Sequence, residues 1–167
     1  WINMTTAVLL GLTLAFEPIE RGIMNRPPRR LETPVLDGAL IRRIVLVSVL
    51  LLGGAFGLYL RELAQGQSLA EARTVAVNVF VLVEMLYLFN CRSLTRGFWS
   101  LGVFSNPWVW GGIGTMAVLQ LLLTYWAPLN AAFSTAPIGL AEWVEIFTFA
   151  LGSSLIIALE KHWTNSR

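Results

Sequence analysis

The chain has 167 residues, of which 56% are hydrophobic and only 13% are charged, whereas an average soluble domain is about 45–50% apolar and about 25% charged. Low charge and many aromatic residues exclude a disordered chain, and the single cysteine, Cys91, excludes a disulfide framework. With a net charge of only +2, we expect no nucleic-acid partner. We expect instead an all-α protein, a polytopic bundle of transmembrane helices.

Five membrane spans are expected, because a transmembrane helix needs about 20 mostly apolar residues. The first, residues 1–16, is uncharged but short, and the sequence begins with Trp as if it were truncated within a helix. Helices are expected rather than strands, because backbone groups in lipid must bond internally. Proline and glycine residues between positions 128 and 139 separate the last two spans. The four further spans cover about residues 38–60, 72–90, 106–126 and 140–163.

The basic residues predict how these spans are oriented. Ten of the twelve Lys and Arg residues fall on one side of the five spans, and only Arg61 and Arg73 fall on the other. By the positive-inside rule, the side with ten basic residues is cytoplasmic. The loop of residues 17–37, which contains four prolines, and the C-terminus are therefore expected in the cytoplasm. Aromatic residues near the predicted span ends support the assignment, although they could also pack between helices: Trp99, Trp108, Trp110, Tyr125, Trp126, Trp143 and Trp163.

One acidic residue, Glu84, is expected deep inside a span. It lies 11 residues after Arg73 and 8 before Arg92, which places it roughly 12–16 Å from either edge at about 1.5 Å per residue. A carboxylate costs at least a few kcal/mol there, so it must face protein, water or an ion. Glu84 is therefore either an ion ligand or proton carrier, or a protonated residue hydrogen-bonded between helices.

Polar side chains of the first span could complement Glu84. Asn3 and Thr6 are three residues apart and would share one face of an α-helix. Side-chain oxygens together with a carboxylate are the ligands of hard cations such as Ca²⁺ or Mg²⁺. The alternative is that these side chains bond to a neighbouring helix or to their own backbone.

Glycine residues predict where helices approach closely. Gly53 and Gly57 form a GxxxG motif in the second span, and this motif is typical of close helix contacts in membranes. Gly111, Gly112 and Gly114 are expected to do the same in the fourth span.

Residues 15–29, AFEPIERGIMNRPPR, resemble the loop that follows the sixth membrane helix of P-type cation-transporting ATPases, and the calcium-pump-like (type II) branch most closely. Residues 1–18, 72–93, 106–112 and 140–147 are similar to the sixth, eighth, ninth and tenth helices of that family. The resemblance covers nearly the whole chain and implies that the five spans are helices six to ten of a ten-helix membrane domain. The matching loop positions are Phe16, Pro18, Glu20, Met24, Arg26, Pro27, Pro28 and Arg29.

Pumps of this family couple ATP hydrolysis to cation transport through a phosphorylated aspartate. The chain contains no DKTG, TGE or PEG-type motif, so the resemblance implies a membrane segment that is no enzyme alone but part of one in an intact pump. ATP and Mg²⁺ would bind to the cytoplasmic domains of that pump. The partners would be the lipid bilayer, the N-terminal helices and the phosphorylation domain, and the location the plasma (inner) membrane of a prokaryote.

The resemblance also implies a cation site. The family's N-x-x-T-D ligand pattern corresponds to Asn3 and Thr6, with Ala7 at the aspartate position, and Glu84 corresponds to a ligand of the eighth helix. The missing aspartate argues against a two-calcium site. The transported cation therefore stays open, with Ca²⁺ as one candidate.

In the loop, Glu20, Arg21, Arg26 and Arg29 would face the phosphorylation domain and relay its movements to the helices. Contact with lipid headgroups is the alternative for these arginines. For the chain as a whole, the alternatives are a degenerate, non-catalytic scaffold that no longer binds cation, a split-gene subunit, or an independent secondary transporter or channel.

Overall fold

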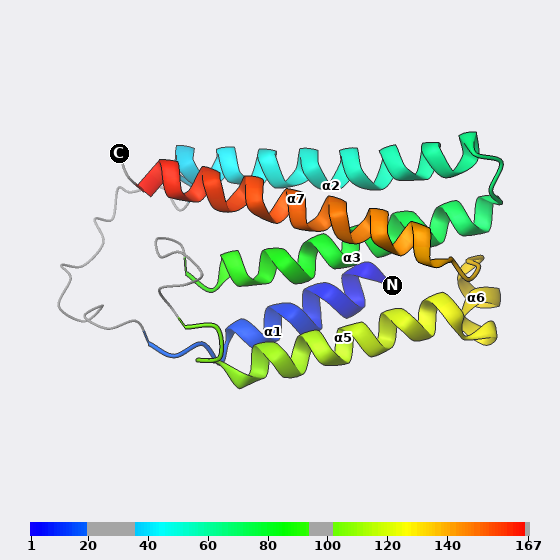
Figure 1. Ribbon diagram of the computed structural model, residues 1–167. Helices are drawn as coiled ribbons and strands as arrows, with labels where there is room; N and C mark the ends of the chain where they lie inside the picture. The colour runs from blue at the N-terminus through cyan, green and yellow to red at the C-terminus, as the bar shows by residue number, and fades with distance from the viewer. Residues whose placement is uncertain (20–35, 94–101, 166–167) are drawn as a thin grey trace.

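The computed structural model describes residues 1–19, 36–93 and 102–165, and every regular element in these ranges is a helix (Figure 1). The expectation of an all-α polytopic bundle is confirmed. Within these ranges four helices (α2, α3, α5 and α7) are long and apolar enough to cross a membrane, and a shorter apolar helix precedes them. The elements are η1 (Asn3–Leu10, a π-helix), α1 (Gly11–Leu14), α2 (Gly38–Ala64), α3 (Leu69–Cys91), α5 (Pro107–Tyr125), α6 (Ala127–Phe133) and α7 (Leu140–Asn165).

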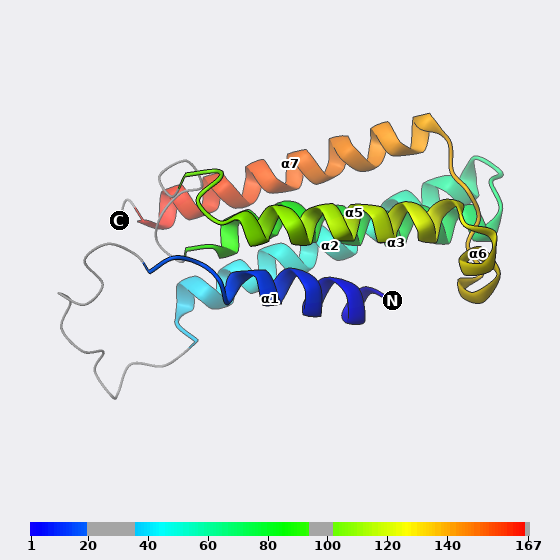
Figure 2. The same cartoon turned by 90° about the horizontal axis from the view of Figure 1, so that it is seen from below.

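Helix α3 is the centre of the bundle. It lies between α2 and α7 on one side and α1 and α5 on the other (Figure 1), and it packs against α2, α7, α5 and η1. Half of its most apolar stretch is buried inside the protein, compared with 22% for α2 and α7. Figure 2 places α1 and α7 on opposite outer sides of the bundle. The buried residues of α3 therefore lie close to several other helices.

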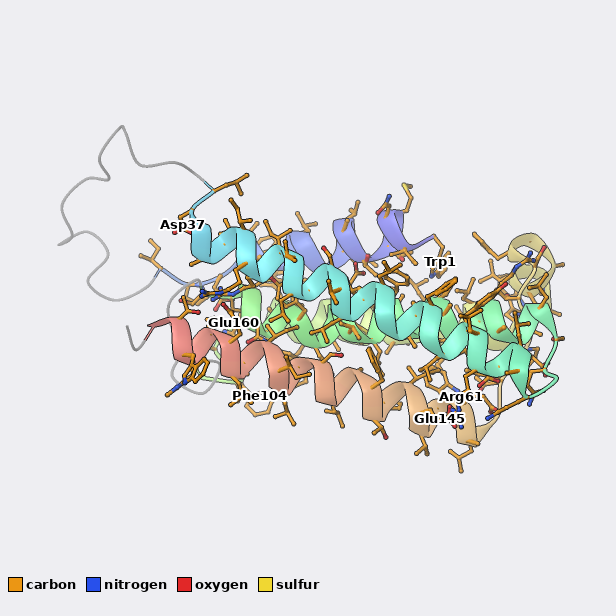
Figure 3. All side chains as sticks on the ribbon, turned by 90° about the horizontal axis from the view of Figure 1, so that it is seen from above. Trp1, Asp37, Arg61, Phe104, Glu145 and Glu160 are labelled. Carbon is orange, nitrogen blue, oxygen red and sulfur yellow. The ribbon has the colours of Figure 1, made fainter. Side chains whose placement is uncertain are left out.

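The chain path gives the bundle two distinct ends. Helix α2 begins, α3 ends, α5 begins and α7 ends at the same end (Figure 1), which we call the basic end. Figure 3 shows Asp37 and Glu160 at this end, and Arg61 with Glu145 at the opposite end. The path thus groups the described basic residues as the sequence predicts, with Arg42, Arg43, Arg92 and Lys161 at the basic end.

Local capping chemistry explains where three spanning helices begin. The side chain of Asp37 caps α2 by accepting a backbone N–H at 2.7 Å. Ser68 and Glu71 form a reciprocal capping box at the start of α3. Asn106 caps α5, with Pro107 at the first helical position, where proline is favoured because it lacks an N–H.

The expected contact at the GxxxG motif is not made within the described residues. A Cβ atom added to Gly53 or Gly57 would meet nothing within 4 Å among the described residues, whereas one added to Gly54 would overlap the ring of Phe149 on α7. Successive residues lie about 100° apart around a helix, so Gly53 and Gly57 fall beside the buried face that Gly54 occupies. In α5, Gly112 alone of the three glycines is close to α1.

Candidate cation site

Glu84 lies on α3, one residue before the buried Met85, and its side chain is half-buried. It lines a groove of about 170 Å³ between η1, α1 and α3. Its Oε2 atom is buried and has no hydrogen-bond partner among the described residues. A buried polar atom without a partner costs free energy, so this oxygen marks a position where a further group is needed.

Thr6 reaches the same groove from η1. Its side chain is buried, and its hydroxyl donates to the carbonyl oxygen of Ile2 at 2.7 Å. The Glu84 side chain lines the same groove from α3. The structure therefore brings together two of the residues that the sequence predicted, one from each of two packed helices.

Asn3 is not brought to this groove. Its side chain is exposed, whereas that of Thr6 is only 4% exposed. The expectation that Asn3 and Thr6 share a face assumed an α-helix, but residues Asn3–Leu10 form a π-helix. Its i→i+5 hydrogen bonds widen each turn, so residues three apart no longer align. As a ligand, Asn3 remains a prediction.

The rest of the groove offers few ligands. Ala7 lines it at the position where the family pattern has an aspartate. No group of three or more His, Cys, Asp or Glu residues that could hold a metal occurs in residues 1–19, 36–93 and 102–165. Since Ca²⁺ takes 6–8 oxygen ligands, the carboxylate of Glu84 and the hydroxyl of Thr6 would form only part of its shell. The other groove-lining residues are Leu10, Gly11, Leu14, Tyr87, Leu88 and Cys91.

The loop residues that the sequence singled out, Glu20, Arg21, Arg26 and Arg29, lie outside the described residues. The first residues after α1 are described, and they contain an ion pair that the sequence did not predict. Arg92, directly after α3, donates from Nη2 to Glu17 Oε1 at 2.7 Å and from Nε at 3.0 Å. The Arg92 side chain is 0% exposed and that of Glu17 is 16% exposed. One feature of the sequence could have suggested this ion pair: an acidic and a basic residue, Glu17 and Arg92, each follow a predicted span.

Further hydrogen bonds complete this cluster. Asn106 Nδ2 donates to Glu17 Oε2 at 2.8 Å and to the carbonyl oxygen of Thr13 at 3.2 Å. Arg92 also donates to the carbonyl oxygen of Gly102 at 3.1 Å. Burial raises the pKa of the Glu17 carboxyl, but the hydrogen bonds from Arg92 and Asn106 and the charge of Arg92 outweigh burial, so the pKa lies below its ordinary value. Glu17 is therefore ionised at neutral pH.

Other basic residues at this end also join helices. Arg42 and Arg43 of α2 both pair with Glu160 of α7, at 3.1 and 3.2 Å. Lys161 Nζ donates to the carbonyl oxygen of Asn90 at 2.9 Å, which satisfies a free carbonyl in the last turn of α3. The basic residues that predict the orientation thus also tie α2, α3 and α7 together.

Comparison with known proteins gives one consistent family. The family described as "Cation transporting ATPase, C-terminus" matches residues 1–163. The chain is 51% identical over 160 residues to a probable cation-transporting ATPase F of Mycobacterium tuberculosis, covering 96% of this chain and 18% of that protein. It is 27% identical over 165 residues to the calcium-transporting ATPase type 2C member 2 of Mus musculus, covering 98% of this chain and 17% of that protein.

A third relative, the calcium-transporting ATPase 1 of Schizosaccharomyces pombe, is 26% identical over the full 167 residues, which are 18% of its length. The chain therefore spans less than a fifth of the relatives it matches. The family match over almost every residue agrees with the helical, multi-pass fold. The chain belongs to the cation-transporting ATPase family, as a C-terminal membrane segment of a calcium-pump-like P-type ATPase.

Proposed function

We propose that this chain forms transport helices of an ATP-driven cation pump, in which Glu84 and Thr6 supply oxygen ligands to the transported cation. The observation that carries this proposal is the buried, unpartnered Oε2 atom of Glu84, which lies within a spanning helix beside the Thr6 hydroxyl. A carboxylate at such a depth is costly unless a positive charge or a proton compensates it. A cation crossing the membrane would supply that charge.

The ligand set supports Ca²⁺ as the candidate cargo but with fewer charges than a two-ion site needs. Asn3 would supply a third oxygen ligand to the cation, since its exposed side chain can face other helices of a longer pump. Ala7 contributes no carboxylate at the edge of the groove. A single divalent cation, completed by ligands from other helices, fits this arrangement best. Relatives that are named calcium-transporting ATPases favour the same cargo.

In the intact pump, ATP and Mg²⁺ would bind to cytoplasmic domains, and the phosphorylation domain would act on the loop of residues 17–37 through Glu20, Arg21, Arg26 and Arg29. The lipid bilayer and the other helices of the pump would surround this segment. The mycobacterial relative supports the plasma membrane of a prokaryote as its location.

Replacing Glu84 tests the proposal. In the intact pump, Glu84→Gln keeps the shape of the side chain but removes its charge, so the Ca²⁺ concentration for half-maximal phosphorylation by ATP should rise about tenfold or more, which corresponds to about 1.4 kcal/mol. Phosphoenzyme formation with radiolabelled ATP measures this. Glu145→Gln, at the opposite end of the bundle, is the matched control. An unchanged Ca²⁺ dependence would remove Glu84 from the site.

A second candidate function is a degenerate membrane scaffold, and the alanine at position 7 favours it. If Ca²⁺ binding was lost together with the family's aspartate at position 7, Ala7→Asp in the intact pump should restore Ca²⁺ binding, because the new carboxylate would enter the groove that Glu84 lines. Equilibrium ⁴⁵Ca²⁺ binding measures the change. Strong binding by the unmodified pump would instead contradict the scaffold.

A further inference from the structure

The cluster around Arg92 joins three separate segments of the chain at the basic end. Glu17 follows α1, Arg92 follows α3, and Asn106 begins α5. The Arg92 guanidinium makes three hydrogen bonds to Glu17, of 2.7, 3.0 and 3.1 Å. It also donates to Gly102 and Ser105 in the chain that leads into α5. Planar, multidentate arginine pairs of this kind fix orientation as well as distance.

Two of these three segments follow the helices that line the candidate cation site. Thr6 lies 11 residues before Glu17, and Glu84 lies 8 residues before Arg92. The pair Glu17–Arg92 therefore ties the two helices that carry Thr6 and Glu84, at roughly two to three helical turns beyond the site. Between this ion pair and the site, η1 also packs directly against α3 and α5.

We propose that Arg92 is a positioning residue, which clamps the chain at Glu17 to α3 and α5. A displacement applied where the 17–37 loop begins is then delivered to the helices of Thr6 and Glu84 together, and their relative position is preserved. Without the clamp, α1 would shift past α3, and the displacement would be absorbed before it reached the site. The transport part of this inference rests on the proposed function; the clamp itself does not.

The burial of the cluster distinguishes it from an ordinary surface ion pair. The Arg92 side chain is completely buried, and Asn106, also 0% exposed, holds the second oxygen of the Glu17 carboxylate. By contrast, the Arg61–Glu145 pair at the opposite end is 44% and 29% exposed. Exposed pairs contribute little and do not hold a fixed geometry. This makes Arg61 a suitable control position.

The experiment uses the intact pump and two measurements. Spin labels at positions 19 and 104, both of which are exposed residues, report the distance between the segment after α1 and the segment before α5. The rate of phosphoenzyme formation at saturating Ca²⁺, together with the half-saturating Ca²⁺ concentration, reports coupling and binding separately. The variants are Arg92→Ala, Arg92→Lys, Glu17→Ala, the Glu17→Ala/Arg92→Ala double variant, and Arg61→Ala as the control.

We expect Arg92→Ala to broaden the distance distribution and to slow phosphorylation at least fivefold, while the half-saturating Ca²⁺ concentration changes less than twofold. Arg92→Lys should recover part of the rate, and the double variant should be no slower than either single one, because the two residues act as a unit. If Arg92→Ala does not fold, Glu17→Gln, which removes the charge and keeps the shape, carries the same comparison.

The inference would be overturned by a distance distribution that stays narrow without Arg92, or by an equal loss of rate in Arg61→Ala. A double variant slowed by the product of the two single effects would do the same. If the unmodified pump forms no Ca²⁺-dependent phosphoenzyme, the proposed function fails, and the spin-label distances still decide whether the clamp exists.

Discussion

Single charged residues in this protein act according to where they are buried. Glu84 carries an unpartnered oxygen within a span, whereas Glu17 has its carboxylate held by Arg92 and Asn106. The carboxylate of Glu84 could therefore bind a cation. That of Glu17 could not, because the guanidinium of Arg92 already pairs with it. Two carboxylates on neighbouring segments therefore have different roles, and their partners decide which.

The lowered pKa of Glu17 predicts a pH dependence. Its contribution to stability should be complete above the ordinary value of about 4.5 and should be lost as the pH falls through the lower value of the folded protein. Glu17→Gln leaves Arg92 buried without its charged partner, so it should destabilise the protein by about 3 kcal/mol at neutral pH.

Thermal unfolding of the two proteins between pH 3 and pH 7 checks this prediction. The difference between them should stay constant down to about pH 4.5 and should shrink at lower pH, as Glu17 of the unmodified protein becomes protonated. A difference that grows on acidification would contradict the ion pair.

At the scale of elements, the contact between α2 and α7 depends on one small residue. Gly54 lets the ring of Phe149 approach the backbone of α2, whereas Gly53 and Gly57 of the GxxxG motif meet none of the residues that the structure describes. The polar contacts of the basic end reinforce the same pair of helices, through Arg42, Arg43 and Glu160. Thus α2 is held to α7 at mid-length by shape and at both ends by charge, because Arg61 of α2 pairs with Glu145 of α7 at the opposite end.

Gly54→Leu should therefore destabilise the protein by about 1–3 kcal/mol, the usual cost of overpacking a filled core. The added side chain would displace the ring of Phe149, so Phe149→Ala should rescue part of the loss. Thermal unfolding in detergent measures both effects. Gly57→Leu is the matched control, and a larger effect there than at Gly54 would show that the motif, rather than Gly54, makes the essential contact.

At the scale of the whole molecule, composition and charge were sufficient to predict the helical bundle and the end at which the basic residues gather. Long apolar stretches specify helices wherever they occur, because lipid leaves the backbone no other partner. The π-helix Asn3–Leu10, which separates Asn3 from Thr6, could not be predicted in this way, because an apolar composition indicates a helix but not its hydrogen-bond pattern. The same holds for the pair of Glu17 and Arg92, which are 75 residues apart in the sequence.

The paired basic residues have a consequence for how the protein matures. The positive-inside rule predicts that Arg42, Arg43 and Lys161 orient their side of the chain toward the cytoplasm while the helices insert. Once the bundle has packed, the same groups are engaged by Glu160 and by the end of α3. If these residues set the orientation, we expect the helices to take their direction in the membrane before α2, α3 and α7 pack against one another.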